Sequence, residues 1–493
     1  MLLNLALAVL SALLLVVSFP RLDFYLLAPL ALAPLLIATA RERRPGRRFL
    51  CGWAAGVVYW AGACYWIQSV LAVHGAVPPA ASWAMLALFS AAKALHLAVF
   101  ALLAGLLIHR PCAILSLPAL WVALESTHGS LGFAWLALGN AGIDMDAPLR
   151  LAPFTGVWGL SFVFAMTASA VALLALRRPP RQFVPLLVLP LLYLLPQLPP
   201  PQPGTETAVL VQPNISESAE WTPDFVADVH RRLASLSLHT APGAKLILWP
   251  EIPAPIYYYE SALERQAIGN LARQANAYLL LNVVPHDPQG FPLNSALLIS
   301  PDGQPLGRYD KMNLVPFGEF VPALFKPLVD KVSSQAGDFA PGRNQVLLPA
   351  GPHRLGVFIC YESVFPNFVR QFAARGADLL VNISNDGWYG DSAARYQHLK
   401  IVRMRAAENR RWLLRSTNDG LTSVIDPAGR LDQLLPPYLA AAAPANFSYL
   451  ASLTFYTRHG NWFPWLCAIC AVGVLACGRT TKSGSPWTSV AIP

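Results

Sequence analysis

Long apolar stretches dominate the first 196 residues of the chain, and one more lies near its end. A membrane-spanning helix needs about 17–25 consecutive, mostly apolar residues. Eight runs fit this requirement, at about 2–19, 22–40, 49–73, 80–108, 111–127, 153–176, 182–196 and 462–478. Pro185 and Pro190 interrupt the seventh run, which is also short, so its ends are the least defined. The pattern predicts a multi-pass α-helical membrane domain with eight spans.

The first run has an alternative interpretation as a secretory signal peptide. A signal peptide begins with a basic segment, which this chain lacks, and a second long apolar run follows almost immediately. We therefore expect a helix that is retained in the protein.

Between residues 197 and 461 the pattern changes to short, β-rich apolar runs separated by amphipathic stretches. The β-rich runs are TAVLVQPNI, KLILWPEIP, AYLLLNVVP, NSALLISPDG, RLGVFICYES, ADLLVNISND, WLLRSTNDG and TSVIDPAG, and the helical stretches include 223–239, 261–276, 363–375 and 393–411. Near-continuous apolar strands that alternate with helices are typical of an α/β domain with covered sheets. We thus expect a membrane domain over 1–196, an α/β domain over 197–461 that begins with a Pro-rich linker, and an eighth span with a tail over 462–493.

Composition agrees with this division. Hydrophobic residues make up 55% of the 493 residues and charged residues only 13%, which is too apolar for an ordinary soluble protein. The net charge of +9 is concentrated in residues 1–196, where 12 Lys and Arg face 5 Asp and Glu, whereas residues 197–461 hold 22 of each. The basic excess therefore reflects membrane topology, and a nucleic-acid partner is not expected.

The basic residues also predict the orientation. Eleven of them fall in loops on one side of the membrane, namely the five arginines of 41–48, then Arg110, Arg177, Arg178, Arg181, Arg479 and Lys482. Only Arg21 and Arg150 lie in the short loops of the opposite side. Cytoplasmic loops carry the excess of Lys and Arg, so both termini are expected in the cytoplasm. The 197–461 domain then lies outside, which for a bacterial inner membrane is the periplasm.

Three ionisable residues lie inside or at the end of apolar runs: Lys93 and His96, one helical turn apart, and Glu125. An ionisable residue within a membrane span is a functional candidate. A residue that snorkels or faces the interior of the bundle explains the same pattern, so both interpretations stay open.

Cys360 is the one cysteine of residues 197–461, whereas the other six lie in or beside apolar runs. A lone thiol in an oxidising compartment has no internal disulfide partner and is open to oxidation, so its presence suggests a nucleophile. Cys467 and Cys470 form a C-x-x-C sequence within a span, without the βαβ context of a redox motif, and we expect no redox role for them.

Two further segments place chemically useful residues near strand ends. A buried strand in LILWPEIP ends at Glu251, and Pro250 and Pro253 restrict the backbone around it. The stretch YDKMNLVPFGEFVP holds Lys311 and Glu319. In GVFICYESVFP a strand leads to Cys360 and then to a turn and a helix, a geometry that exposes a nucleophile and directs backbone N–H groups towards an oxyanion.

These residues together suit acyl transfer through a covalent intermediate. The thiol reacts as a thiolate, so a base such as Glu251 must take its proton. Lys311 would stabilise the thiolate and the tetrahedral oxyanion. The ten histidines have no ligand-like spacing, so we expect neither a metal site nor a cofactor.

The motifs WPE, YDKMNLVPFGEFVP, CYESVFP and NISNDGWYG resemble those of the carbon–nitrogen hydrolase (nitrilase) superfamily. A domain of that type placed before the last of eight spans is similar to the apolipoprotein N-acyltransferase family, the membrane-bound branch of the superfamily. The resemblance covers nearly the whole chain and includes GVWGLSF at 156–162 and TRHGN at 457–461. It implies a nitrilase-like αββα sandwich for the α/β domain.

The resemblance also implies residue roles. Glu251 would be the general base, Lys311 the oxyanion-stabilising lysine and Cys360 the nucleophile. Glu319, Tyr361 and Glu362 match supporting positions. Trp221 matches a family tryptophan that contacts substrate, and Trp388 and Tyr389 match an aromatic lid near the entrance, although membrane-interface anchoring is an alternative for these aromatic residues.

The chain departs from the family pattern at three places. The family has an arginine soon after the glutamate of the fifth span, where this chain has Ser126, Thr127 and His128. Ala134 replaces a proline, and Asn461 stands where aspartate is common. These changes affect local loop geometry and leave the Glu, Lys and Cys positions intact.

The activity implied is ping-pong acyl transfer from a membrane phospholipid to the α-amine of a diacylglyceryl-cysteine at the N-terminus of an apolipoprotein. The enzyme would act as a monomer. Two rivals are a membrane-tethered nitrilase-type amidase that uses water as acceptor, and a receptor or transporter whose outer domain has lost catalysis. The intact Glu, Lys and Cys positions argue against the second rival.

Overall fold

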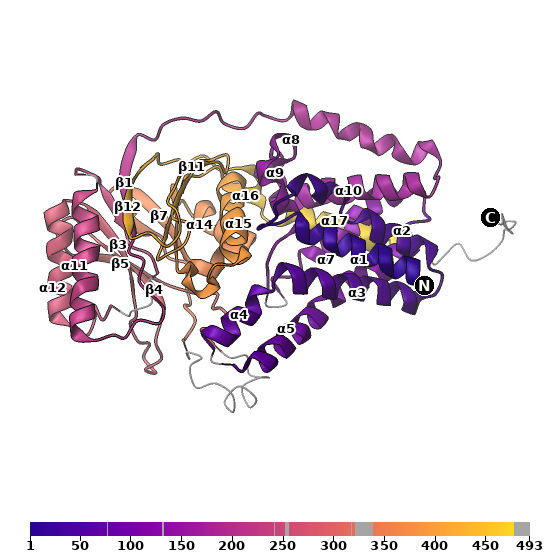
Figure 1. Cartoon of the computed structure of the whole chain (residues 1–493). Helices are drawn as coiled ribbons and strands as arrows, with labels where there is room; N and C mark the ends of the chain where they lie inside the picture. Colours follow the sequence, from indigo (N-terminus) through magenta and orange to yellow (C-terminus); the bar gives the residue numbers. More distant parts are fainter. Residues whose placement is uncertain are drawn as a thin grey trace, which may run out of the picture.

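The computed structural model describes residues 1–75, 77–130, 133–240, 242–251, 256–316, 318–320 and 339–477. The helices of the first 194 residues gather at one side of the molecule, and two β-sheets with their covering helices form the other side (Figure 1). The last helix, α17 (Trp462–Cys477), returns to the helical side and packs against a helix of the first part of the chain. Arg479 and Lys482, two of the charges used to predict the orientation, lie outside the described residues.

The helical half follows the apolar runs. Its elements are α1 (Leu2–Val17), η1 (Tyr25–Leu30), α2 (Ala33–Arg41), α3 (Pro45–Ala63), α4 (Trp66–Val73), α5 (Pro79–Lys93), α6 (Leu95–Leu107), α7 (Ala113–Glu125), η2 (Leu138–Asp144), α8 (Asp146–Leu149), α9 (Ala152–Thr155), α10 (Val157–Ala175), η3 (Pro180–Val188) and η4 (Pro190–Leu194). Every one of the eight apolar runs coincides with helical structure.

Length and composition separate these helices into two groups. Among the described residues, two helices are long and apolar enough to cross a membrane, 79–107, which joins α5 and α6, and 157–175, which is α10. A third candidate is the pair α3 and α4, which is bent by 55°. The remaining apolar helices have 10–17 residues. The fold therefore contains clear spans, and the full count of eight stays a prediction.

The seventh run differs from the expected α-helix. Residues 180–194 form two 3₁₀ helices, η3 and η4, with mostly exposed side chains. Pro185 and Pro190 have no backbone N–H, and their rings clash with the preceding turn of an α-helix. The two prolines therefore explain why this apolar segment forms 3₁₀ helices instead of an α-helix.

Small residues bring helices of this half close together. A Cβ at Gly52 would lie 2.3 Å from the carbonyl oxygen of Leu97, and one at Gly56 would lie 2.5 Å from the Cα of Ala94. In membrane proteins this small-x-x-x-small pattern allows backbone contact between helices. Gly52 and Gly56 on α3 thus seat it against the junction of α5 and α6.

The first sheet has six strands in the order β12-β1-β2-β3-β4-β5. They are β1 (Glu206–Gln212), β2 (Leu246–Leu248), β3 (Tyr278–Val283), β4 (Ser295–Ile299), β5 (Pro305–Asp310) and β12 (Ala441–Phe447). The central strands β1, β2 and β3 are parallel, and the outer pairings are antiparallel. The first and last strands of the α/β half are therefore neighbours in one sheet.

The second sheet repeats this plan in the order β11-β10-β9-β8-β7-β6. Its strands are β6 (Leu348–Ala350), β7 (His353–Ile359), β8 (Leu379–Ser384), β9 (Leu413–Thr417), β10 (Ser423–Ile425) and β11 (Leu431–Leu434). Strands β7, β8 and β9 are parallel, and the flanking strands are antiparallel. The parallel cores of both sheets are nearly continuous in apolar residues, as expected for strands covered on both faces.

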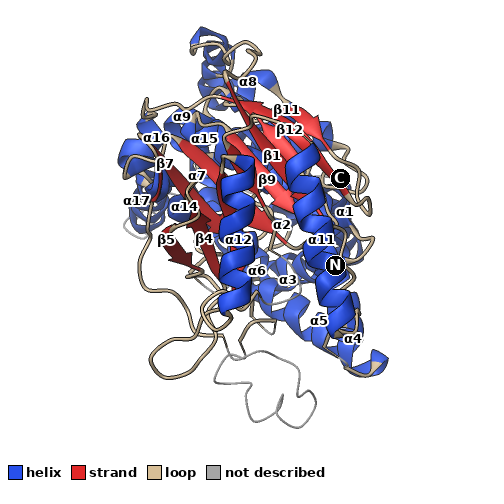
Figure 2. Cartoon of the chain, turned by 90° about the vertical axis from the view of Figure 1, so that its left-hand side faces the viewer, coloured by secondary structure: helices blue, strands red, loops and turns tan. Residues whose placement is uncertain are grey.

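The two sheets pack face to face, and helices cover their outer faces (Figure 2). Side chains that alternate along β1 show the arrangement, because Leu210 joins the core shared with the second sheet whereas Val209 and Val211 pack with α11 (Pro223–His239) and α12 (Ala262–Ala275). The second sheet is covered by α14 (Pro366–Ala374) and α15 (Ala393–Asn409). This is the four-layer αββα sandwich that the family resemblance implied.

Four strands were not expected from the sequence: β5, β6, β11 and β12. Strand β12 has the sequence AAAPANF, which has low β-propensity. Its full register with β1, from Glu206 opposite Phe447 to Gln212 opposite Ala441, comes from tertiary pairing. The helices 223–239, 261–276, 363–375 and 393–411 were expected close to where α11, α12, α14 and α15 lie.

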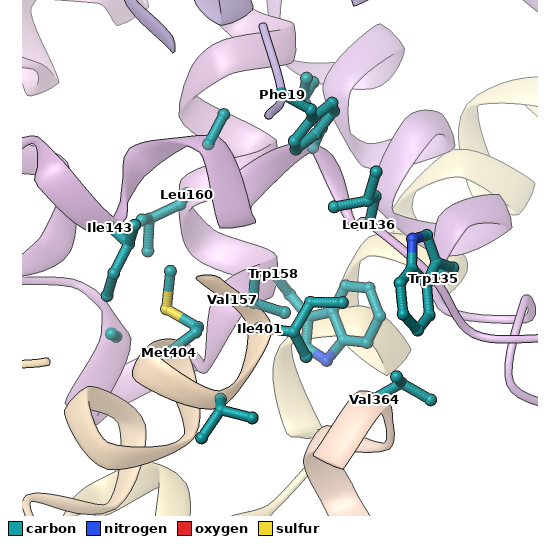
Figure 3. Close-up of a cluster of buried hydrophobic side chains, with 14 of the residues drawn as sticks. Phe19, Trp135, Leu136, Ile143, Val157, Trp158, Leu160, Val364, Ile401 and Met404 are labelled. Carbon is teal, nitrogen blue, oxygen red and sulfur yellow. The ribbon is translucent and has the colours of Figure 1, made fainter. Parts of the chain in front are cut away.

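The α14–α15 layer faces the helical half, so the two halves share one apolar core (Figure 1). Met404 of α15 lies beside Ile143 and Leu160, and Ile401 lies beside Val157 and Trp158 (Figure 3). The backbone N–H of Val157 also donates a hydrogen bond to the buried carboxylate of Glu408 at 2.8 Å. This shared core fixes the membrane helices against the layer that supports Cys360.

Candidate active site

The expected site residues gather where strands end. Glu251 follows β2, Lys311 follows β5, and Cys360 follows β7 directly. In open α/β sheets ligands bind in the crevice outside the carboxyl ends of the strands. All three residues are buried, with 8% of Glu251, 1% of Lys311 and 5% of Cys360 exposed.

Lys311 is held between two carboxylates. Its ammonium donates to Oε1 of Glu319 at 2.8 Å and to Oε1 of Glu251 at 3.2 Å. Asn294 bridges the same two oxygens, because its Nδ2 donates to Glu251 at 2.7 Å and to Glu319 at 2.8 Å. Burial would lower the pKa of the Lys311 ammonium, but these two carboxylates raise it above its ordinary value. Lys311 is therefore a permanent positive charge.

Cys360 stands at a sharp turn between a strand and a helix. Strand β7 ends at Ile359, Cys360 has a left-handed φ of 48°, and the 3₁₀ helix η5 (Cys360–Val364) leads into α14. A non-glycine residue adopts such a φ only when its surroundings fix the backbone. The expected strand, turn and helix around this residue are therefore present.

Glu362 supplies much of that fixation. Its fully buried carboxylate accepts hydrogen bonds from the hydroxyl of Tyr309 at 2.7 Å and from the backbone N–H of Met312 at 2.8 Å, Asn313 at 3.1 Å and Ile359 at 2.8 Å. Burial raises the pKa of this carboxyl, while the four donors favour its charged form. Glu362 thus ties the Cys360 turn to the segment that follows Lys311.

The environment of the thiol disfavours its ionisation in the resting protein. Burial raises the pKa of Cys360 to about 12, and the negative charge of Glu251 acts in the same direction. The charge of Lys311 and a hydrogen bond with the side chain of Ser384 oppose this rise. A thiol with so high a pKa needs a base at hand to become a nucleophile.

A second carboxylate contact fixes Glu251 from the other sheet. The backbone N–H of Asn385, at the end of β8, donates to Oε2 of Glu251 at 3.0 Å. With Lys311 and Asn294 on Oε1, both oxygens of Glu251 are engaged. The orientation of this carboxylate is therefore set by both sheets.

A buried polar network lies behind Cys360. Arg415 donates to both oxygens of Asp386 at 2.7 and 2.8 Å, and Nδ1 of His398 lies 3.3 Å from Asp386. Nε2 of His398 lies 3.2 Å from the carbonyl oxygen of Cys360 and 2.7 Å from the hydroxyl of Ser363. Burial would raise the pKa of Asp386, but the charge of Arg415 and the contacts with His398 hold it well below its usual range. This network positions the backbone of the nucleophile candidate.

Sequence reasoning had singled out none of these network residues, nor Asn294 and Asn385. Asn385 and Asp386 stand in NISNDGWYG, a motif noted for its resemblance, and a polar pair at the end of an apolar strand is a signal that was available. The pairing of Arg415 with Asp386 joins residues 29 positions apart, which no local pattern reveals.

The aromatic candidates occupy different environments. Tyr361 is buried, and its ring lies 6.2 Å from Phe133 and 5.3 Å from Phe365. Tyr389 is also buried, against Trp66 at 5.2 Å, whereas Trp388 is 41% exposed and lies 4.9 Å from the ring of His74. Trp221 is 36% exposed and packs against Phe225 at the start of α11. Only Trp388 and Trp221 therefore present an exposed ring surface.

A cavity of about 270 Å³ lies between the two halves. The helical half contributes residues of the 125–140 segment together with Val157 and Trp158, and the α/β half contributes residues of η5, α14 and α15. The guanidinium of Arg405, buried in this region, pairs with Glu408 at 2.9 Å. The cavity includes Asn313 and Val364, which are close in sequence to Lys311 and Cys360. The described part of the segment between α7 and η2 thus forms one wall of this cavity.

Of the three ionisable candidates in the helical half, Glu125 and Lys93 are buried and His96 is half-buried. Glu125 is buried and accepts a hydrogen bond from the backbone N–H of Leu138 at 2.7 Å. Lys93 is also buried, while Nε2 of His96 lies 3.2 Å from the hydroxyl of Thr127. Cys467 is buried and Cys470 is exposed, and both are free thiols. Across the described ranges, no group of three or more His, Cys, Asp or Glu side chains is arranged to hold a metal ion.

Comparison with known proteins gives two family matches. Residues 207–434 match the carbon-nitrogen hydrolase family, and residues 11–170 match the apolipoprotein N-acyltransferase N-terminal domain. An apolipoprotein N-acyltransferase of Geobacter metallireducens is 36% identical over 97% of this chain and 95% of its own length. One from Azotobacter vinelandii is 35% identical over 95% of this chain and 94% of its own length. Both matches extend over the helical and the α/β halves.

Among solved structures, an amidase from Nesterenkonia sp. aligns with 52% of this chain and 94% of its own, with 20% identity and a TM-score of 0.38.

Proposed function

The chain belongs to the apolipoprotein N-acyltransferase family, and we propose that it transfers an acyl chain from a membrane phospholipid to the α-amine of the S-diacylglyceryl-cysteine of apolipoproteins. The observation that carries the mechanism is the buried arrangement of Glu251, Lys311 and Cys360 at converging strand ends. It combines a base, a fixed positive charge and a thiol in one place. This suits a covalent acyl-enzyme.

In the first half-reaction the sulfur of Cys360 attacks the ester carbonyl carbon of the phospholipid while Glu251 takes the thiol proton. Lys311 lies beside the oxygen that becomes negative and stabilises it. The C–O bond of the ester then breaks, and the departing lysophospholipid oxygen takes the proton from Glu251. The product is a thioester on Cys360.

In the second half-reaction the neutral α-amine of the acceptor attacks the thioester carbon, and Glu251 takes a proton from the attacking nitrogen. The C–S bond breaks, the sulfur leaves as thiolate and regains a proton, and an amide is released. The high pKa of the Cys360 thiol supports a proton transfer coupled to attack in the first step, because free thiolate is scarce near neutral pH.

Supporting residues act around this group. Glu319 and Glu362 hold Lys311 and the Cys360 turn through the hydrogen bonds described above. Tyr361 forms the wall beside the nucleophile. The exposed rings of Trp221 and Trp388 are suited to contact lipid chains, and buried Tyr389 supports the loop that carries Trp388.

We propose eight spans over 1–196 and 462–478, a periplasmic catalytic domain over 197–461 and both termini in the cytoplasm, in the bacterial inner membrane and as a monomer. Contacts at the two ends of the helical half support the proposed grouping of the loops on two sides of the membrane. Asn4 contacts Glu42 and His109 contacts Arg178, all at the expected cytoplasmic end. Asp23 and Asp144, at the other end, pair with Lys400 of the α/β half at 2.6 and 3.2 Å.

The test is to incubate the purified full-length protein in detergent with phospholipid that carries a labelled acyl chain, and to follow label on Cys360. We expect a thioester that persists in water and is discharged by a diacylglyceryl-cysteinyl peptide. Cys360→Ser should abolish it, and Cys112→Ser, an exposed cysteine of the helical half, serves as the matched control.

Rapid release of free fatty acid without acylated peptide would instead indicate the amidase that uses water. Label that survives Cys360→Ser would place the nucleophile elsewhere.

A further inference from the structure

A buried lysine of the helical half, Lys93, contacts a segment that packs beside Tyr361, the residue after Cys360. Lys93 is the last residue of α5, inside the apolar helix 79–107, and only 7% of it is exposed. Removing an ammonium group from water is costly unless it is paired or hydrogen-bonded. The contacts that compensate this cost indicate what Lys93 does.

The ammonium of Lys93 is enclosed by the segment that precedes η2. Its Nζ donates to the carbonyl oxygen of Phe133 at 2.9 Å and lies 3.1 Å from Nδ1 of His128. It also lies 4.9 Å from the ring centroid of Trp60 and 5.8 Å from that of Phe133, distances at which aromatic faces attract a cation. The neighbours of the ammonium are thus one carbonyl, one imidazole and two aromatic rings.

The segment that Lys93 holds, residues 133–135, contacts two residues that adjoin Cys360, namely Tyr361 and His398. The backbone of Ala134 forms a hydrogen bond with the side chain of Tyr361, and the ring of Phe133 lies 6.2 Å from the same tyrosine. The ring of Trp135 lies 5.8 Å from His398, whose Nε2 lies 3.2 Å from the carbonyl oxygen of Cys360.

Trp135 is itself fixed. Its Nε1 donates to Oε1 of Gln397 at 2.8 Å, and the amide of Gln397 donates to the carbonyl oxygens of Pro20 and Ala63 at 3.0 Å each. The C-terminal side of segment 133–135 is therefore anchored on α15 and on the helical half. On its N-terminal side the corresponding hydrogen bond comes from Lys93 to Phe133.

We propose that Lys93 is a positioning residue for acyl transfer: it holds residues 133–135 in register against Tyr361 and His398, so that a membrane helix sets the geometry of the Cys360 turn. The inference rests on the proposed function. Lys93 does not touch the reacting atoms, so its loss should slow formation of the thioester while leaving the nucleophile present.

The variant that tests this is Lys93→Met, which keeps an unbranched side chain and removes the ammonium. We expect the single-turnover rate of thioester formation to fall roughly 10- to 100-fold, the size of effect that a misplacement of about 1 Å has on a reacting group. The fall should appear in kcat, with KM for phospholipid changed by less than about twofold. Lys93→Arg, which can still donate to the Phe133 carbonyl, should recover a large part of the rate.

The matched control is Lys400→Met. Lys400 is another buried lysine between the halves, but it pairs with Asp23 and Asp144 instead of residues 133–135. We expect this control to lower Tm and to keep the rate of thioester formation within about threefold of the parent protein.

The inference is overturned if Lys93→Met lowers Tm alone, if Lys93→Arg is as slow as Lys93→Met, or if Lys400→Met slows the reaction as much. Parent protein that forms no thioester would refute the proposed function itself, which keeps the two failures distinct.

Discussion

At the scale of single residues, the carboxylate of Glu251 has two opposite effects on Cys360 in the proposed mechanism. The charge of Glu251 adds to burial in raising the pKa of the thiol, yet Glu251 is also the group placed to take the thiol proton. Removing the charge of Glu251 should therefore lower the pKa of the Cys360 thiol and at the same time lower the rate of acyl transfer.

We predict that Glu251→Gln lowers the pKa of Cys360 below its value of about 12 in the parent protein, because a neutral amide no longer disfavours the thiolate and Lys311 loses a competing partner. Thioester formation should nevertheless fall by roughly 10²- to 10⁴-fold, since the base is gone. The pH dependence of alkylation by iodoacetamide gives the first quantity, and labelled phospholipid gives the second.

Glu264→Gln, on α12 and away from the site, is the control and should change neither quantity. A thiol pKa that stays the same or rises in Glu251→Gln would contradict this electrostatic description.

The sequence singled out Glu251, Lys311 and Cys360 as candidates: Glu251 and Cys360 follow apolar strands, and Lys311 lies in a motif that resembles the nitrilase superfamily. It did not identify Asn294, Asp386 or Arg415. Asn294 binds Glu319 and Glu251, which lie 25 and 43 positions away, and Asp386 binds Arg415, which lies 29 positions away. Only the tertiary fold brings these partners together. The residues that position a site are thus brought together by the tertiary fold, whereas the candidate reactive residues lie in recognisable local sequence motifs.

At the scale of elements, helix contacts in the membrane half depend on residues without side chains. Gly52 and Gly56 of α3 face the backbone between Ala94 and Leu97, which cannot move aside as a flexible side chain can. These are the residues just after Lys93, so the α3 contact and the Lys93 cluster fall on the same stretch of helix 79–107.

We predict that Gly52→Ala lowers the free energy of unfolding by about 1–3 kcal/mol, because its methyl group would lie 2.3 Å from the carbonyl oxygen of Leu97. Gly473→Ala is the matched control: a Cβ at Gly473, on α17, meets no atom within 4 Å. That change should leave Tm unaltered or raise it slightly, since alanine favours helix. Thermal unfolding in detergent measures both, and equal Tm values for the two variants would refute the close-contact argument.

The elements that the sequence predicts well are those with a strong period or a long apolar run. All eight β-rich runs became strands, and α11 spans residues 223–239 as expected. Strand β12 could not be predicted, because its four alanines and Pro444 carry no β signal and its conformation is imposed by β1. The 3₁₀ conformation of residues 180–194 could not be predicted from the sequence. Prolines in an apolar run can either end an α-helix or convert it to a tighter helix, and packing decides between the two.

At the scale of the whole molecule, the ion pairs that join the two halves within the described residues all lie at one end of the helices. Lys400 and Arg403 of α15 bind Asp144, and Arg21 binds Asp391 near the start of the same helix. The arginine-rich 41–48 loop lies with Asn4 at the other end. In the proposed orientation, the loops that pair with the α/β half are therefore the periplasmic ones.

We predict that a membrane-impermeant maleimide labels Lys245→Cys, at an exposed position of the α/β half, in intact spheroplasts. The exposed native Cys112 should react only after lysis, because it lies in a loop proposed to be cytoplasmic. Each cysteine is tested in a chain that lacks the other and in which Cys470 and Cys477 are replaced by serine. Labelling of Cys112 before lysis would reverse the proposed orientation.

The pairing of β1 with β12 has a consequence for the order of synthesis. Strand β1 pairs with β12 along its full length, and Thr205 beside it is hydrogen-bonded to Ser448. During synthesis, β1 therefore cannot form this pairing until the ribosome has passed residue 447. The partner of α7, helix α17, is made later still. A nascent or truncated chain would leave the edge of β1 open, a feature that invites aggregation and degradation. We therefore expect the residues around Cys360 to reach their final arrangement only in a chain that extends past residue 447. Shorter products would then lack the site that we propose acts on lipids.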